Sequence, residues 1–319
     1  MKTIAEWAAQ LPEQEGYLAL SYLLDTTPGA LRAKCAESLP AEIIRRYQEL
    51  VRRRLAGEPL QYAIGEWEFY GHLFHVDARA LIPRPETERL VEMVLQENLA
   101  GKIIADIGTG TGAIALSIAL EAHPQPKKIY ATDCSIDALT LARENAIRLL
   151  PSGGGASEQP ASAELASVQP ASAEPASVQP ASAEPASAQS TPNDASAAAQ
   201  NMIEWVLGDG PSALPETVDI LVSNPPYIDP QEKESLQEEL RYEPASALFA
   251  GEPGKEGLAL YQAWIPMLPA LLRPQGVVLM EIGDRQGEAV SALFRQAGFC
   301  AVTVHSDYTG RDRIVRAKR

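Results

Sequence analysis

The chain has 319 residues, of which 45% are hydrophobic, and it carries a formal net charge of −15 at pH 7. This length and apolar content predict more than one domain with a sizeable core, and the acidic balance argues against a general nucleic-acid binder, which shows a basic footprint. No apolar run approaches the roughly 20 residues that cross a bilayer, and the N-terminus lacks the apolar core of a signal peptide, so we expect a cytoplasmic protein without membrane contact.

Residues 1–58 are expected to form a bundle of helices. Thr27 before Pro28 is typical of a helix start, because proline is tolerated in the first helical turn. Apolar side chains spaced three and four apart over residues 41–51 predict a further helix, which Gly57 would end.

Residues 59–80 are expected to form a β-hairpin that links this bundle to the rest of the chain. Residues 66–70 alternate between polar and apolar side chains, and Gly71 suits the turn. His72 and His75 would point to opposite faces of a strand or straddle the turn, so we expect no metal site there. The three cysteines are widely spaced, which fits reduced thiols better than a disulfide or zinc framework.

From residue 81 onward helices and strands alternate, which predicts an α/β fold with a doubly wound parallel sheet. The expected strands cover residues 103–107, 128–133, 203–209, 218–223, 277–282, 301–304 and 313–317.

Residues 151–200 interrupt this alternation. A decapeptide that begins at Ala161 recurs over 171–180 and, less faithfully, over 181–190. It has recurrent prolines and no aromatic residue, so it cannot bury enough apolar surface to offset the entropy lost on ordering. We expect a disordered insert, which is either an expansion tolerated in a surface loop or an arm that binds a partner.

The first strand of this region runs into a glycine-rich loop, Gly108-Thr109-Gly110-Thr111-Gly112. Glycines let a backbone turn tightly and approach a ligand, and the loop also fits the G-x-G-x-x-A pattern of dinucleotide-binding folds. Asp106, at the end of the strand, would repel a pyrophosphate but suits a cationic ligand such as S-adenosylmethionine. A dinucleotide nevertheless remains an alternative at this point.

Two further acids follow predicted strands. Asp133 lies at the distance from the glycine loop that is typical of a carboxylate binding ribose hydroxyls, a role that serves either cofactor. Asp209 could accept a hydrogen bond from an adenine amino group, or it could simply cap a helix or turn.

The strand at 218–223 ends in Asn224-Pro225-Pro226-Tyr227. Two prolines stop the strand and stiffen the turn, and ligands of open α/β sheets bind at this edge. The Asn224 side-chain oxygen and the Pro225 carbonyl can each accept one N–H, while Tyr227 can stack on a planar group. The turn therefore suits an uncharged NH2 group, with an ordinary strand-ending turn as the alternative.

Together, the segment from Asp106 to Gly112 and the Asn-Pro-Pro-Tyr turn resemble the class I S-adenosylmethionine-dependent methyltransferases that modify planar amino groups. Further segments narrow the resemblance to the peptide chain release factor glutamine methyltransferases, the PrmC/HemK family. These segments are Leu81-Ile-Pro-Arg-Pro-Glu-Thr-Glu88, Arg241-Tyr-Glu-Pro244 and Gly310-Arg-Asp-Arg313. The resemblance runs from about Pro59 to the C-terminus and leaves out the insert.

The resemblance implies a Rossmann-like, seven-stranded methyltransferase domain over residues 81–319 and a substrate-recognition role for residues 1–58. It implies that S-adenosylmethionine donates a methyl group to the glutamine side-chain amide in the Gly-Gly-Gln motif of class I release factors. Cofactor-binding residues would be Gly108, Thr109, Gly110, Thr111, Gly112, Asp133 and Asn224. Substrate-binding residues would be Asn224, Pro225, Pro226 and Tyr227, of which Asn224, Pro225 and Tyr227 would act in catalysis.

Some roles stay open within this resemblance. Arg84 and Thr87 would lie near the cofactor or the substrate entrance, or would only shape a loop and a helix start. Gly210 stands where some relatives carry a larger side chain, so we expect a more open adenine pocket.

Two other functions compete. One is a methyltransferase that acts on an exocyclic amine of adenine or guanine in nucleic acid, because such enzymes also use this kind of turn. The other is a non-catalytic adaptor that binds the cofactor or another protein. The acidic balance disfavours the first, and the intact turn at Asn224 disfavours the second.

Overall fold

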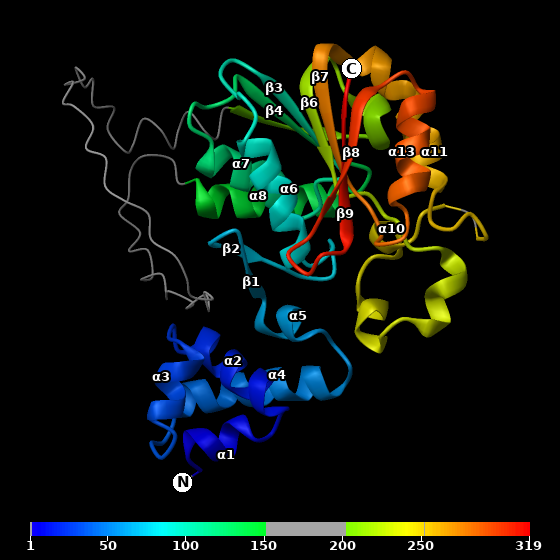
Figure 1. The fold of residues 1–319 in the computed structure, drawn as a ribbon. Helices are drawn as coiled ribbons and strands as arrows, with labels where there is room; N and C mark the ends of the chain where they lie inside the picture. Colours follow the sequence, from blue (N-terminus) through cyan, green and yellow to red (C-terminus); the bar gives the residue numbers. More distant parts are fainter. Residues whose placement is uncertain (1, 151–201, 252) are drawn as a thin grey trace, which may run out of the picture.

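The computed structural model describes residues 2–150, 202–251 and 253–319. The predicted insert at 151–200 lies outside these residues. A group of N-terminal helices and a larger domain built on a seven-stranded sheet are joined by a two-stranded hairpin (Figure 1). In the part of the chain that the structure describes, no helix is both long enough and apolar enough to cross a membrane.

The N-terminal helices are α1 (Ile4–Ala8), α2 (Glu13–Leu23), α3 (Pro28–Ala33), α4 (Ala41–Leu55) and α5 (Leu60–Ile64). As predicted, α3 begins after Thr27, whose Oγ1 accepts a hydrogen bond from the Ala30 backbone N–H at 3.1 Å. The helices share a core around Tyr47, which is fully buried and meets the Trp7 ring edge to face at 6.4 Å. These helices therefore have a hydrophobic core of their own.

The hairpin is shorter than the sequence predicts, with strands β1 (Glu66–Phe69) and β2 (His72–His75). The preceding residues form helix α5, which starts after Pro59 and ends at Gly65 in the left-handed region. Leu60 packs into the N-terminal core, whereas Tyr62 belongs to the core of the large domain. A helix places these side chains on different faces, which explains why this segment is not a strand.

In the large domain the helices are α6 (Pro85–Leu95), α7 (Ala113–Glu121), α8 (Ile136–Leu149), α10 (Ala245–Leu248), α11 (Ala259–Trp264), α12 (Leu268–Leu271) and α13 (Gly287–Gln296). Its strands are β3 (Ile103–Ile107), β4 (Lys128–Asp133), β5 (Ile203–Leu207), β6 (Val218–Ser223), β7 (Leu272–Glu281), β8 (Cys300–Ser306) and β9 (Asp312–Lys318). Short 3₁₀ helices are η1 (Gly210–Ala213), η2 (Pro230–Ser235), η3 (Glu238–Tyr242) and η4 (Ile265–Met267).

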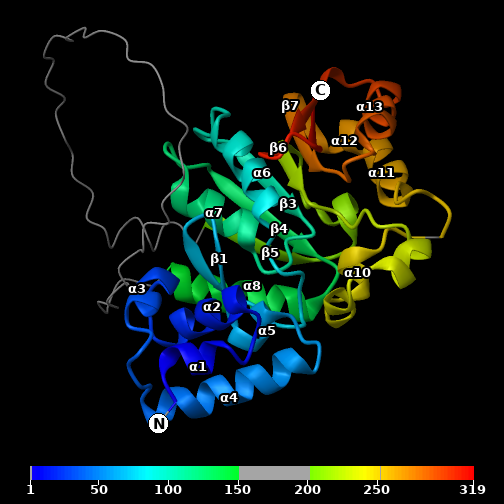
Figure 2. The ribbon, with the colours of Figure 1, turned by 60° about the horizontal axis from the view of Figure 1, so that its bottom comes forward.

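The sheet order is β5-β4-β3-β6-β7-β9-β8, with β5 to β7 parallel and β9 antiparallel to both of its neighbours. The predicted seven-stranded methyltransferase-type sheet is thus confirmed. Successive residues of a strand point to opposite faces. Ile104 of β3 belongs to the core beneath α6 and α7, whereas its neighbour Ala105 belongs to the core beneath α11 and α13. Figure 2 shows these two helical layers on either side of the sheet.

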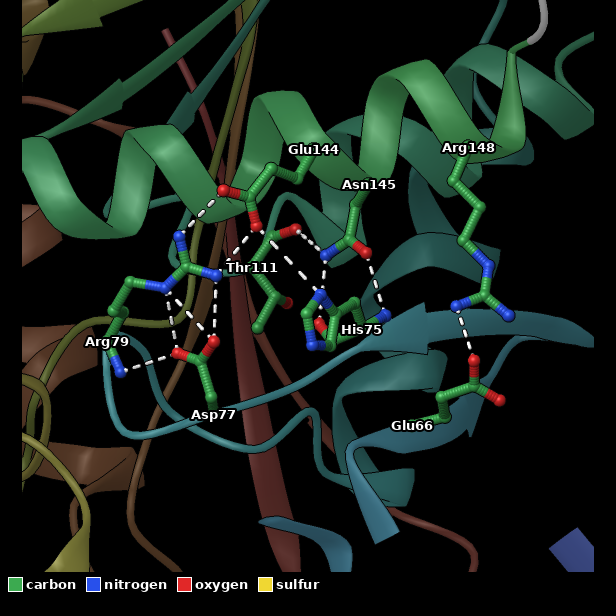
Figure 3. Close-up of polar contacts among 8 residues, drawn as sticks. All are labelled: Glu66, His75, Asp77, Arg79, Thr111, Glu144, Asn145 and Arg148. Carbon is green, nitrogen blue, oxygen red and sulfur yellow. Dashed lines mark hydrogen bonds and ion pairs between the residues drawn. The ribbon is translucent and has the colours of Figure 1, made fainter. Parts of the chain in front are cut away.

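One buried amide ties the hairpin to the large domain (Figure 3). Asn145 on α8 accepts from the His75 backbone N–H at 2.7 Å and donates to the His75 carbonyl and the Thr111 carbonyl at 3.1 and 3.0 Å. Nearby, Arg79 bridges Asp77 and Glu144. Asn145 therefore links β2 and the glycine-rich loop to a single helix.

We expect Asn145→Ala to lower the free energy of unfolding by about 3 kcal/mol, because it leaves buried backbone groups without partners. Urea unfolding measures this change. Thr140→Ala on the exposed face of α8 is the control and should change stability by less than about 0.5 kcal/mol. Equal effects of the two substitutions would show that the Asn145 hydrogen bonds add nothing.

Candidate active site

A cavity of about 310 Å³ lies at the carboxyl ends of β3, β4 and β6. Its lining includes most of the residues predicted from the sequence: Gly108, Thr109, Gly110, Thr111, Asp133, Asp209, Asn224 and Pro226. Arg84 and Thr87 also line it, whereas Gly112, Pro225 and Tyr227 do not. The fold thus brings five separate sequence segments to one site.

The glycine-rich loop turns around the end of β4. The Gly108 and Thr109 backbone N–H groups both donate to the Thr132 carbonyl, at 2.9 and 2.8 Å. Gly112 has φ +81°, and a side chain there would approach Leu116 at 3.0 Å. The positive φ and the close packing behind the cavity both favour glycine at this position, while its contact with a ligand stays a prediction.

Asp106 does not face the cavity, which corrects the prediction that it meets a cationic ligand. It is fully buried, and its Oδ2 accepts from Thr109 Oγ1 at 2.6 Å and from the Ala115 backbone N–H at 3.2 Å. Its Oδ1 has no hydrogen-bond partner among the described residues. Burial raises the pKa of Asp106 to about 7. The carboxylate therefore shapes the glycine-rich loop from beneath.

Asp133 reaches the cavity from the end of β4. Its Oδ2 accepts from the Gly110 backbone N–H and its Oδ1 from the Ser135 backbone N–H, each at 2.9 Å. These two bonds fix the plane of the carboxylate, while each oxygen keeps a second acceptor position. Asp133 can thus accept hydrogen bonds from a pair of ligand hydroxyls.

The Asn-Pro-Pro-Tyr turn is held from several sides. Asn224 Nδ2 donates to Thr87 Oγ1 at 3.1 Å. The Tyr227 carbonyl accepts from Gln286 Nε2 at 3.1 Å, and the Tyr227 ring packs against the core beneath α11 and α13. Burial raises the pKa of Tyr227 to about 12. Thr87 is thereby placed in direct contact with Asn224, a contact that the sequence could not specify.

The sequence predicted that the adenine pocket would be more open at Gly210, but another side chain fills this space. A Cβ atom on Gly210 would lie 2.6 Å from the indole nitrogen of Trp264, and both residues line the cavity. The Trp264 ring therefore takes the space that Gly210 leaves. Asp209 precedes η1 without a side-chain capping bond, so the capping role considered for it is absent.

Glu243 is a site residue whose role the sequence did not reveal. It is buried, and its carboxylate accepts from the Ile82 backbone N–H at 3.0 Å and from Arg84. Because residues 81–84 line the cavity, Glu243 fixes that wall. The sequence signal that could have indicated this role is the place of Glu243 in the Arg241-Tyr-Glu-Pro244 segment.

Asp106 should make stability depend on pH. Its pKa lies above the ordinary value of 3.8, so between about pH 4 and pH 7 the folded protein holds a proton that the unfolded chain has released. The free energy of unfolding of the wild type, measured against Asp106→Asn in urea, should therefore fall as pH rises to about 7 and then level off. A difference in unfolding free energy between the two proteins that stays constant with pH would contradict a raised pKa of the buried Asp106 carboxyl.

Comparisons with known proteins identify the family of this chain. The PrmC N-terminal domain family matches residues 5–65. The release factor glutamine methyltransferase of Cereibacter sphaeroides is 35% identical over 300 residues, covering 94% of this chain and 88% of that protein. The protein of the same name from Neisseria gonorrhoeae is 34% identical over 318 residues, covering 99% of this chain and 97% of that protein. The chain therefore belongs to the release factor glutamine methyltransferase family.

Proposed function

We propose that this chain transfers a methyl group from S-adenosylmethionine to the side-chain amide nitrogen of the glutamine in the Gly-Gly-Gln motif of class I release factors. The observation that carries the proposal is Asn224 at the cavity wall, with its amide nitrogen bonded to Thr87. Its Oδ1 is then left to accept from an NH2 group. The names of the relatives supply the glutamine of a release factor as the acceptor.

The cavity suits S-adenosylmethionine, which supplies an electrophilic methyl group when bound. The glycine-rich loop offers a side-chain-free wall at Gly108 and Gly110, both with positive φ. Asp133 presents carboxylate oxygens for ribose hydroxyls. Trp264 and Asp209 lie at the far wall, where a flat aromatic base could pack and donate a hydrogen bond.

The residues of the turn would orient the acceptor amide. Asn224 Oδ1 and the Pro225 carbonyl would accept the two N–H groups of the glutamine, which would aim the nitrogen along one direction. Of these two residues, Asn224 lines the cavity and Pro225 lies next to it in the turn. Such positioning and the exclusion of water supply most of the expected rate gain, because an amide nitrogen is nearly non-basic. In this structure Tyr227 does not line the cavity, and its ring packs against the core. We propose that the ring contacts the face of the amide once the substrate is bound.

A methyltransferase acting on nucleic-acid amines is the disfavoured alternative. The net charge of −15 would repel a polyanion, and the relatives named above are release factor enzymes.

We propose that the helices over residues 1–58 contact the release factor, because they form a separate core beside the hairpin.

Purified protein incubated with labelled S-adenosylmethionine and a class I release factor should place the label on the release factor. Replacing the glutamine of its Gly-Gly-Gln motif should abolish this labelling. Asn224→Ala should reduce kcat by at least about a hundredfold, because the acceptor loses its orientation. Asn98→Ala, at an exposed asparagine before β3, is the control and should retain full activity. Label on RNA or DNA alone would instead support the alternative.

Asp133→Asn should weaken S-adenosylmethionine binding by roughly ten- to a hundredfold, the loss expected for one charge-assisted hydrogen bond. Isothermal titration calorimetry measures this without any acceptor substrate. Asp137→Asn, at an exposed acid in the first turn of α8, is the matched control and should bind as the wild type does. Equal affinities of all three proteins for S-adenosylmethionine would show that Asp133 does not bind the cofactor.

A further inference from the structure

Glu281 is a buried carboxylate that the proposed reaction does not use. It ends β7, which runs parallel to β6 with Met280 opposite Ser223, so Glu281 stands beside Asn224 at the edge of the sheet. The residue is 1% exposed and is not among those that line the cavity. Glu281 can therefore affect a ligand there only through another residue.

Thr87 is that intermediate residue. It lies buried in the first turn of α6, where its Oγ1 donates to Glu281 Oε2 at 2.8 Å and accepts from Asn224 Nδ2 at 3.1 Å. Glu281, Thr87 and Asn224 thus form one chain of hydrogen bonds, which we call the relay.

The direction of the relay follows from the count of protons. An ionised carboxylate can only accept, so the single hydroxyl proton of Thr87 goes to Glu281. The Thr87 oxygen is then left with lone pairs and must accept from Asn224. A flipped Asn224 amide would bring its own oxygen against those lone pairs and lose the bond, which is costly at a half-buried position.

We propose that Glu281 and Thr87 are positioning residues, which hold the nitrogen of the Asn224 amide inward so that Oδ1 is the atom offered to the substrate. This inference rests on the proposed function, since it concerns how Asn224 receives a glutamine side chain. An accepting oxygen favours the NH2 end of a primary amide, whereas a flipped Asn224 would attract the carbonyl end. The relay therefore selects which atom of the glutamine amide is presented for methylation.

The relay depends on the charge of Glu281. Burial raises the pKa of Glu281 to about 7. Below that pH the neutral carboxyl can donate to Thr87, whose own proton can then turn toward Asn224 and allow the flipped amide. The titratable and charged groups that face Glu281 from the surrounding elements are Arg84, Glu86, Tyr227, Tyr261 and Arg313.

Two substitutions of Thr87 separate the hydroxyl from the packing. With both substrates saturating at alkaline pH, Thr87→Val should lower kcat roughly ten- to a hundredfold with little change in KM, as expected when an orienting group is misplaced. Thr87→Ser keeps the hydroxyl and should regain most of this loss. Ser291→Ala, which removes a buried hydroxyl from α13, should retain wild-type kcat.

The pH dependence of the ratio of wild-type kcat to Thr87→Val kcat separates the two explanations, because a loss of packing alone would not make this ratio change with pH. This ratio should be large above about pH 8 and should approach one as pH falls below about 7, because Glu281 then gains its proton. Contributions from Asp106 are common to both proteins and cancel. A ratio near one at every pH, a large ratio that does not change with pH, or an equal loss in Thr87→Ser would each overturn the proposal.

A second measurement does not require activity. In ¹⁵N-labelled protein, the Asn224 side-chain NH2 signals can be identified by their loss in Asn224→Ala. One of these protons should be protected from exchange in the wild type and in Thr87→Ser but not in Thr87→Val. Equal exchange in all three would overturn the relay, whereas a wild type that methylates no release factor would contradict the proposed function alone.

Discussion

The parallel pairing of β3 between β4 and β6 is the constraint on which the rest of the structure depends. Ile107 lies opposite Thr132 on one side and Ser223 on the other, so the three strands end in line. The next residues along each strand therefore meet at one edge, where parallel sheets bind ligands. A shift of one residue in either pairing would turn the side chains of that strand to the other face and take the site apart.

Behind this edge, three buried carboxylates each hold a different wall of the cavity. Asp106 supports the glycine-rich loop, Glu243 fixes residues 81–84, and Glu281 reaches Asn224 through Thr87. A buried carboxylate is costly unless donors surround it, so each one also restricts the groups that it binds. The cavity is consequently preorganised by groups that do not themselves line it.

Much of this arrangement follows from local sequence patterns. Short apolar runs ending in Gly, Asp or Asn predicted the strands of the parallel sheet and the glycine-rich loop. Contacts between distant segments were not accessible in this way: Glu281 is far from Asn224 in sequence, and only the β6–β7 pairing makes them neighbours. For the same reason Gly210 suggested an open pocket, although Trp264 from a later helix fills that space. Helix α5 was missed because its apolar residues serve two different cores.

A crystal structure of the chain with S-adenosylhomocysteine and a class I release factor would test the central claim most directly. The account predicts that the sulfur lies beside the glycine-rich loop and that the glutamine Nε2 of the Gly-Gly-Gln motif lies within hydrogen-bond distance of Asn224 Oδ1 and the Pro225 carbonyl. A glutamine bound away from this turn, or one whose carbonyl oxygen meets the Asn224 amide nitrogen, would contradict it.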